Sequence, residues 1–99
     1  MVAVGRHADH ELRVAREHGL GVEMQVFANP SVLADDYRPL VKSMVKRLAR
    51  IEGPIGYHGP YIDTIHFSYD LEIMAASRRR DLQAMDIAEE LGARFVGFH

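Results

Sequence analysis

The most regular pattern of apolar residues lies in the middle of the chain. Apolar side chains recur there at three- and four-residue intervals, and basic residues stand at several positions between them. The apolar positions are Tyr37, Leu40, Val41, Met44, Val45 and Leu48. This spacing places them in one stripe and predicts an amphipathic helix, with Asp35 and Asp36 available to cap its start. Pro39 lies in the first turn, where proline is tolerated, and Gly53-Pro54 should end the helix.

Two further helices are predicted, one on each side of the central helix. The first covers Ala8–His18 and ends at Gly19, and the last covers residues 70–91 and ends at Gly92. Glycine is common directly after a helix because it readily adopts the left-handed conformation that ends one. The last helix should turn four residues towards a core, which are Leu82, Met85, Ala88 and Leu91.

Short apolar runs between the helices predict four strands, at residues 2–5, 22–27, 55–58 and 94–99. Residues 59–69 begin with Gly59-Pro60 and are predicted to form a loop. Because a helix separates each strand from the next, the strands should be parallel and joined by right-handed crossovers. The predicted fold class is therefore α/β, with the order β-α-β-α-β-α-β and a single domain over residues 1–99.

Composition narrows the classes of function. With 47% hydrophobic and 26% charged residues among 99, the chain resembles an ordinary soluble domain. The absence of cysteine excludes disulfides and thiolate metal sites. A net charge of −2 gives no general attraction to nucleic acid or to an anionic membrane. Because the sequence has no apolar run long enough to span a bilayer and no secretory signal, we expect a cytoplasmic protein without membrane partners.

Short motifs with known mechanisms add little to this picture. The sequence contains no glycine-rich phosphate loop, no H-E-x-x-H and no G-x-S-x-G. The basic run Arg78-Arg79-Arg80 lies in the last predicted helix and is expected to be a solvated face. The aromatic residues are not clustered into a stacking surface, so we do not expect nucleic acid as a partner.

The candidate functional residues lie at or near the ends of the predicted strands. In parallel α/β folds, chemistry gathers at the carboxyl ends of strands, where His7, His58 and His99 stand in this sequence. Glu23 interrupts the apolar second strand, and Gln25 should point to the same side. Imidazole and carboxylate groups suit proton transfer or metal binding. Glu23 therefore either faces a site or is paired structurally, and His7 is expected to be a surface residue.

Several segments together resemble the xylose-isomerase-like TIM-barrel superfamily, which contains sugar and sugar phosphate isomerases and epimerases as well as endonuclease IV. The resemblance extends from about Leu20 to the end of the chain. The segments that carry it are Gly21-Val-Glu-Met-Gln25, Tyr57-His-Gly-Pro-Tyr-Ile-Asp63, Ser77, Ala88-x-x-Leu-Gly-Ala93 and Phe95-Val-Gly-Phe-His99. Members of the superfamily are (β/α)8 barrels, so the resemblance implies that this chain corresponds to strands one to four, the amino-terminal half.

The resemblance implies a metal-dependent sugar or sugar phosphate isomerase or epimerase, with a small sugar or sugar phosphate as ligand. Glu23 matches a second-strand glutamate of that branch, and Glu23, His58 and His99 would line the substrate pocket. The implied cofactor is a divalent cation, which is zinc, manganese or magnesium. The main metal ligands of that branch lie in the second half of the barrel, and this chain has no corresponding positions.

Two alternatives stay open. His58 and His99 match the two histidines that ligate zinc in endonuclease IV, so an endonuclease IV-like phosphodiesterase that cleaves at abasic sites is the enzymatic alternative. The non-enzymatic alternative is a half-barrel that only folds and self-associates. In all three cases we expect either association with a second copy or a missing second half of the barrel, because four strands leave two edges unpaired.

Overall fold

Four strands form one parallel sheet in the computed structural model, which describes residues 1–61 and 64–98. The strands are β1 (Val2–Val4), β2 (Val22–Met24), β3 (Ile55–His58) and β4 (Phe95–Gly97). They lie in the sheet in sequence order, β1-β2-β3-β4, and each neighbouring pair is parallel. The helices between them are α1 (Ala8–His18), α2 (Pro30–Ala34), α3 (Arg38–Leu48) and α4 (Leu71–Leu91). The predicted α/β class with parallel strands and interleaved helices is confirmed.

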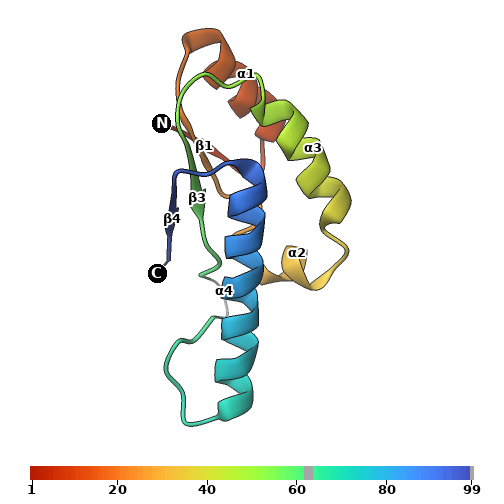
Figure 1. Ribbon diagram of the computed structural model, residues 1–99, viewed down its shortest axis with the longest axis vertical. Helices are drawn as coiled ribbons and strands as arrows, with labels where there is room; N and C mark the ends of the chain where they lie inside the picture. Colours follow the sequence, from red (N-terminus) through yellow and green to blue (C-terminus); the bar gives the residue numbers. More distant parts are fainter. Residues whose placement is uncertain (62–63, 99) are drawn as a thin grey trace.

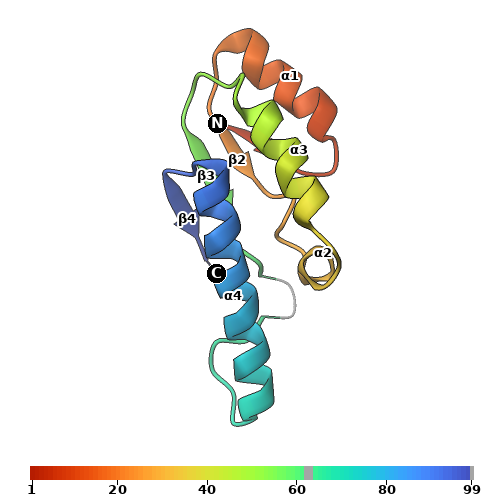
Figure 2. The ribbon, with the colours of Figure 1, turned by 45° about the vertical axis from the view of Figure 1, so that its right-hand side comes forward.

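The helices cover one face of the sheet and leave the other open (Figures 1 and 2). Alternate strand residues point to the two faces. Val4, Met24 and Tyr57 are buried beneath the helices, whereas their neighbours Ala3 and Glu23 lie on the open face and keep contact with solvent. The sheet therefore has a dry face that packs against the helices and a second face that no described helix covers.

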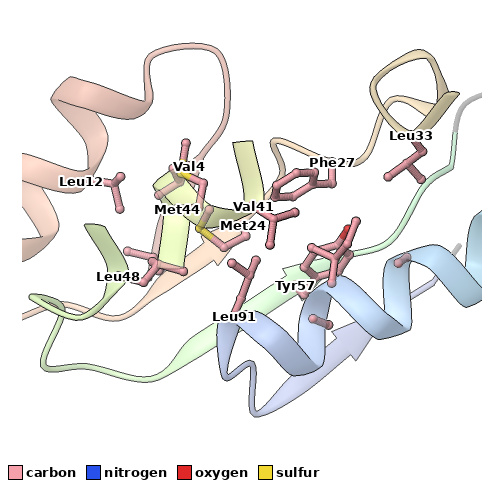
Figure 3. Packing of buried hydrophobic residues seen from close by; sticks show 14 of the residues in the cluster. Val4, Leu12, Met24, Phe27, Leu33, Val41, Met44, Leu48, Tyr57 and Leu91 are labelled. Carbon is pink, nitrogen blue, oxygen red and sulfur yellow. The ribbon is translucent and has the colours of Figure 1, made fainter. Parts of the chain in front are cut away.

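The core lies between the sheet and the helices (Figure 3). Leu12 of α1, Val41 of α3 and Leu91 of α4 pack there against strand residues. The Tyr57 ring stacks on Phe27, with ring centroids 6.1 Å apart. Burial of these side chains removes apolar surface from water, which is the main force that holds the layers together.

The Tyr57 hydroxyl is an exception to the apolar character of this core. Tyr57 is 1% exposed, and its hydroxyl oxygen has no hydrogen-bond partner among the described residues. Burial raises the pKa of this hydroxyl far above its usual value, and the nearby Tyr37 acts in the same direction.

The predicted ends of the first and last helices are confirmed. Gly19 and Gly92 follow α1 and α4 in the left-handed conformation, with φ of 63° and 74°. The Asp70 carboxylate accepts a hydrogen bond from the Glu72 amide at 2.9 Å, which satisfies one free N–H group in the first turn of α4. Pro39 lies in the first turn of α3, as predicted. No helix in the described ranges combines the length and apolar character needed to cross a bilayer.

Three predicted boundaries are wrong. The second strand ends at Met24 rather than at residue 27, because the Ala28 amide bonds to the Gln25 carbonyl at 3.1 Å and turns the chain. The short helix α2 follows, and Asn29 caps it by accepting a hydrogen bond from the Ser31 amide. The α3 helix ends at Leu48, before Gly53-Pro54, and β4 covers Phe95–Gly97 rather than residues 94–99.

The predicted buried face of α4 is correct only in part. Ala88 and Leu91 are buried, but Leu82 and Met85 are 56% and 53% exposed. The buried stripe of this helix continues instead through the small residues Ser77 and Ala84, and the Ser77 hydroxyl accepts a hydrogen bond from the Ile65 amide at 2.8 Å. Leu82 and Met85 lie beside this stripe and line a shallow groove that reaches Val96 of β4.

Candidate functional site

The open face of the sheet carries a row of paired residues in which small and larger side chains alternate. The row is formed by Ala3, Glu23, Gly56 and Phe95, which are register partners on neighbouring strands. The Phe95 ring lies across Gly56. A Cβ atom added to Gly56 would lie only 2.2 Å from the nearest atom of that ring. Glu23 therefore stands in the row between a small side chain and a glycine, with room for a partner.

That partner is His58, the last residue of β3. Its Nδ1 atom lies 3.4 Å from Oε1 of Glu23, within ion-pair distance when the imidazole is protonated. The same carboxylate oxygen accepts a hydrogen bond from Nε2 of Gln25 at 3.3 Å. The side chains of His58 and Glu23 are 16% and 35% exposed, so the pair is partly desolvated but open to a ligand. Glu23 thus faces the candidate site and is also paired.

Tyr61 completes this group on the outer side. Its ring meets the His58 ring edge to face, with centroids 5.0 Å apart and an angle of 77° between the planes. The Gly59-Pro60 turn that leads to Tyr61 is buried, and the Gly59 amide donates a hydrogen bond to the Gly97 carbonyl at 2.8 Å. This bond extends the pairing of β3 with β4 past His58 and fixes where the turn begins.

A pocket of about 480 Å³ adjoins the group at the carboxyl end of the sheet. Gln25 and Tyr61 belong both to its lining and to the group around His58. Arg6, which follows β1, and Asn29, which follows β2, line it as well. The sequence prediction missed Arg6 and Asn29, although each follows a strand towards the edge at which parallel α/β folds place their ligands.

The structure tests the predictions for the individual site residues to different extents. Glu23 and His58 come together as described above. His7 directly precedes α1 and is exposed, in agreement with the surface role expected for it. His99 lies outside the described residues, so its placement beside His58 stays a prediction.

The metal-binding potential of this group is small by itself. Glu23 and His58 offer two donor atoms, and no set of three His, Asp or Glu side chains within residues 1–61 and 64–98 is arranged to hold an ion. Stable zinc sites use three or four protein ligands. The described residues of this chain therefore do not fit a resident metal, although they could supply two ligands to a larger site.

Without a resident metal, the side chains around His58 can still form hydrogen bonds and exchange protons. A carboxylate beside an imidazole holds the ring in one orientation and can accept or release a proton through it. The Gln25 amide and the Arg6 guanidinium add hydrogen-bond donors at the pocket.

Searches with this chain found no matching family model, no matching curated protein and no matching solved structure.

Proposed function

We propose that this chain supplies the first four strands, with the helices that connect them, of a sugar or sugar phosphate isomerase or epimerase with a TIM-barrel fold. The observation that carries the proposal is the Glu23–His58 pair, which stands on the open face of the sheet beside a polar pocket. The pair and the pocket lie where barrel enzymes bind their substrates, at the carboxyl ends of the strands.

The sheet topology supports the barrel part of the proposal. The strands follow one another in sequence order, are all parallel and carry their helices on one face (Figure 1). In a (β/α)8 barrel the helices form the outer layer, and the opposite face of the sheet encloses the interior. Further strands, from a second copy or from a longer chain, would complete the barrel and cover the open face.

The side chains present suit a polyhydroxylated ligand. The Glu23 carboxylate and the Gln25 side chain can accept and donate hydrogen bonds to neighbouring hydroxyl groups. The His58 imidazole, held by Glu23, can move a proton to or from such a group. A bound divalent cation would polarise the substrate oxygens in this class of enzyme. Because the described residues provide at most two ligands for it, we assign no step of the reaction to the metal.

The charges at the pocket favour a sugar over a nucleic-acid backbone. A nuclease grips a polyanion through several lysine and arginine contacts. Among the described residues, Arg6 is the basic side chain that lines this pocket, and the Glu23 carboxylate nearby would repel a phosphate backbone. The endonuclease IV-like alternative is therefore the weaker of the two enzymatic proposals.

The test is a nuclear magnetic resonance titration of the ¹⁵N-labelled chain with a panel of ketoses, aldoses and their phosphates. We expect the amide signals of Gln25, His58 and Tyr61 to shift at millimolar concentrations of at least one sugar. His58→Ala should abolish the shifts. The matched control is His66→Ala, which removes the histidine of another histidine–carboxylate pair, with Asp81, outside this pocket.

Three outcomes would overturn the proposal. Equal loss of the sugar response in His58→Ala and His66→Ala would show that the pair has no specific role. Binding of a duplex with an abasic site, without a response to any sugar, would favour the phosphodiesterase alternative. The absence of both responses would leave the chain as a non-catalytic half-barrel.

A further inference from the structure

A second cleft lies on the helix side of the sheet, between α1 and α3, which run side by side in Figures 1 and 2. Its volume is about 430 Å³, and Leu12 and Ile51 supply apolar lining. Five basic side chains also line it, and they are Arg13, Arg16, Lys46, Arg47 and Arg50. The cleft is separate from the Glu23–His58 pair, which lies on the opposite face of the sheet.

The concentration of positive charge in this cleft contrasts with the rest of the chain. The sequence has 12 basic and 14 acidic residues, yet five of the basic residues meet at this one cleft. Among the described residues, Asp9 is the acidic side chain in its lining, and it binds Arg47. The cleft keeps an excess of four positive charges, which repel one another unless an anion lies between them.

Helix dipoles explain only part of this arrangement. Arg16 lies in the last turn of α1, and Lys46 and Arg47 lie in the last turn of α3, where basic residues stabilise a helix. That effect acts on each helix separately. It accounts neither for the convergence of the two helices on one cleft nor for Arg13 and Arg50, which add to the same positive region. Each helix end contributes only about half a negative charge, too little to balance the cleft.

The run Arg78-Arg79-Arg80 on α4 shows what an ordinary basic helix face looks like in this chain. Consecutive residues point in different directions around a helix, so these three side chains cannot converge on one ligand. Arg78 and Arg79 are exposed, in agreement with the solvated face predicted for them, and Arg80 bonds to the Leu33 carbonyl and to Gln83. The cleft between α1 and α3 differs because two helices direct their charges into one space.

We propose that this cleft binds a small anion that carries two or more phosphate groups. Four of its five basic residues are arginines, whose planar guanidinium groups donate paired hydrogen bonds to phosphate oxygens. The cleft volume lies within the range of about 300–1,000 Å³ that is typical of small-molecule sites. Its two-helix walls confine a compact ligand, whereas a nucleic-acid backbone would need a longer basic track.

The test is isothermal titration calorimetry of the full chain with inorganic tripolyphosphate at low and at moderate salt. We expect binding that weakens as salt increases, because salt screens the charge–charge attraction. The double variant Arg16→Gln/Lys46→Gln should lower the affinity on the order of tenfold or more, since it removes two of the five positive charges that line the cleft. The matched control is Arg78→Gln/Arg79→Gln, which removes the same charge from exposed positions on α4.

Three results would overturn the proposal. The first is the absence of heat with tripolyphosphate at low salt when circular dichroism shows a folded chain. The second is an equal loss of affinity in the cleft variant and in the α4 control, which would indicate attraction by overall charge. The third is tighter binding of an oligonucleotide than of tripolyphosphate with the same dependence on Arg16 and Lys46, which would identify a nucleic-acid backbone as the ligand.

Discussion

Replacement of Tyr57 by phenylalanine should stabilise this protein. Tyr57 is 1% exposed, and its hydroxyl lies in the core with no hydrogen-bond partner among the described residues. In the unfolded chain water satisfies the same hydroxyl, so its burial opposes folding. The Tyr57→Phe variant removes the hydroxyl and keeps the ring that stacks on Phe27.

The size of the effect follows from the cost of an unsatisfied polar group. A buried hydroxyl without a partner costs about 1–3 kcal/mol. Because the substitution leaves a small gap where the oxygen was, we expect a net gain of about 1 kcal/mol in the free energy of unfolding. For a domain of this length, that gain corresponds to a rise in Tm of about 4–8 °C.

The pH dependence provides an independent check. Burial raises the pKa of the Tyr57 hydroxyl above its ordinary value of 10.0, so the unfolded chain releases this proton at a lower pH than the folded chain. Ionisation of Tyr57 therefore leaves the stability unchanged below about pH 10, and above that pH the stability of the wild-type protein falls until the pH reaches the folded pKa. At pH 11 the wild-type protein should have lost about 1 kcal/mol relative to Tyr57→Phe.

Urea unfolding followed by circular dichroism, at pH 7 and at pH 11, measures both effects. The gap in stability between variant and wild type should be positive at pH 7 and larger at pH 11. Destabilisation by Tyr57→Phe at pH 7, together with a gap that does not grow with pH, would show that the hydroxyl is hydrogen-bonded or exposed. It would also contradict the strand register that places Tyr57 in the core and His58 on the open face.

Three further predictions test the open face and its surroundings. Gly56→Ala should lower the free energy of unfolding by about 1–3 kcal/mol, because the new Cβ would lie 2.2 Å from the Phe95 ring. A Cβ atom at Gly97 would meet no atom within 4 Å, so Gly97→Ala should cost less, and equal losses in urea unfolding would refute this packing. The chain should self-associate in sedimentation velocity experiments, since β1 and β4 each leave one edge unpaired among the described residues, and a stable, monodisperse monomer would refute it. After dialysis the chain should retain little zinc by atomic absorption. Stoichiometric retention that His58→Ala or His99→Ala abolishes would instead indicate a site completed between chains.

Local signals predicted most of the elements. Gly19 and Gly92 marked the ends of α1 and α4 because their left-handed conformation depends on the backbone alone. The helix α2 was missed because five residues are too few to show helical periodicity. Asn29 as a cap with proline in the first turn is a known helix start, so the residues did contain the information.

Packing and register were harder to predict than the elements. Leu82 and Met85 were assigned to the core because large apolar residues usually gain most from burial. The structure buries the small residues Ser77 and Ala84 instead, and the hydrogen bond between Ser77 and the Ile65 amide depends on where the preceding loop lies. The sequence of one helix does not show which of two adjacent stripes of side chains packs against the neighbouring elements.

The candidate site shows the same division between local and long-range information. The sequence indicated that Glu23 was unusual in an apolar strand and that Gln25 shared its side, and the hydrogen bond between them confirms the shared side. The contact of Glu23 with His58 depends instead on the register between β2 and β3, in which Glu23 faces Gly56. Strands separated by more than 30 residues carry no local signal of this register, so the pair could be proposed but not located.

Covering the open face of the sheet would change the environment of the Glu23–His58 pair. Phe95 is 47% exposed, and its ring lies across Gly56 on the open face as an apolar surface that water covers unfavourably. A second sheet or a second copy that covered this ring would also exclude water from Glu23 and His58. Electrostatic interactions strengthen as the local dielectric constant falls, so the 3.4 Å contact would then hold the imidazole more firmly than it does in the open sheet. Association and proton transfer would therefore be coupled through one surface, because the apolar Phe95 ring that favours closure lies on the same face as Glu23 and His58.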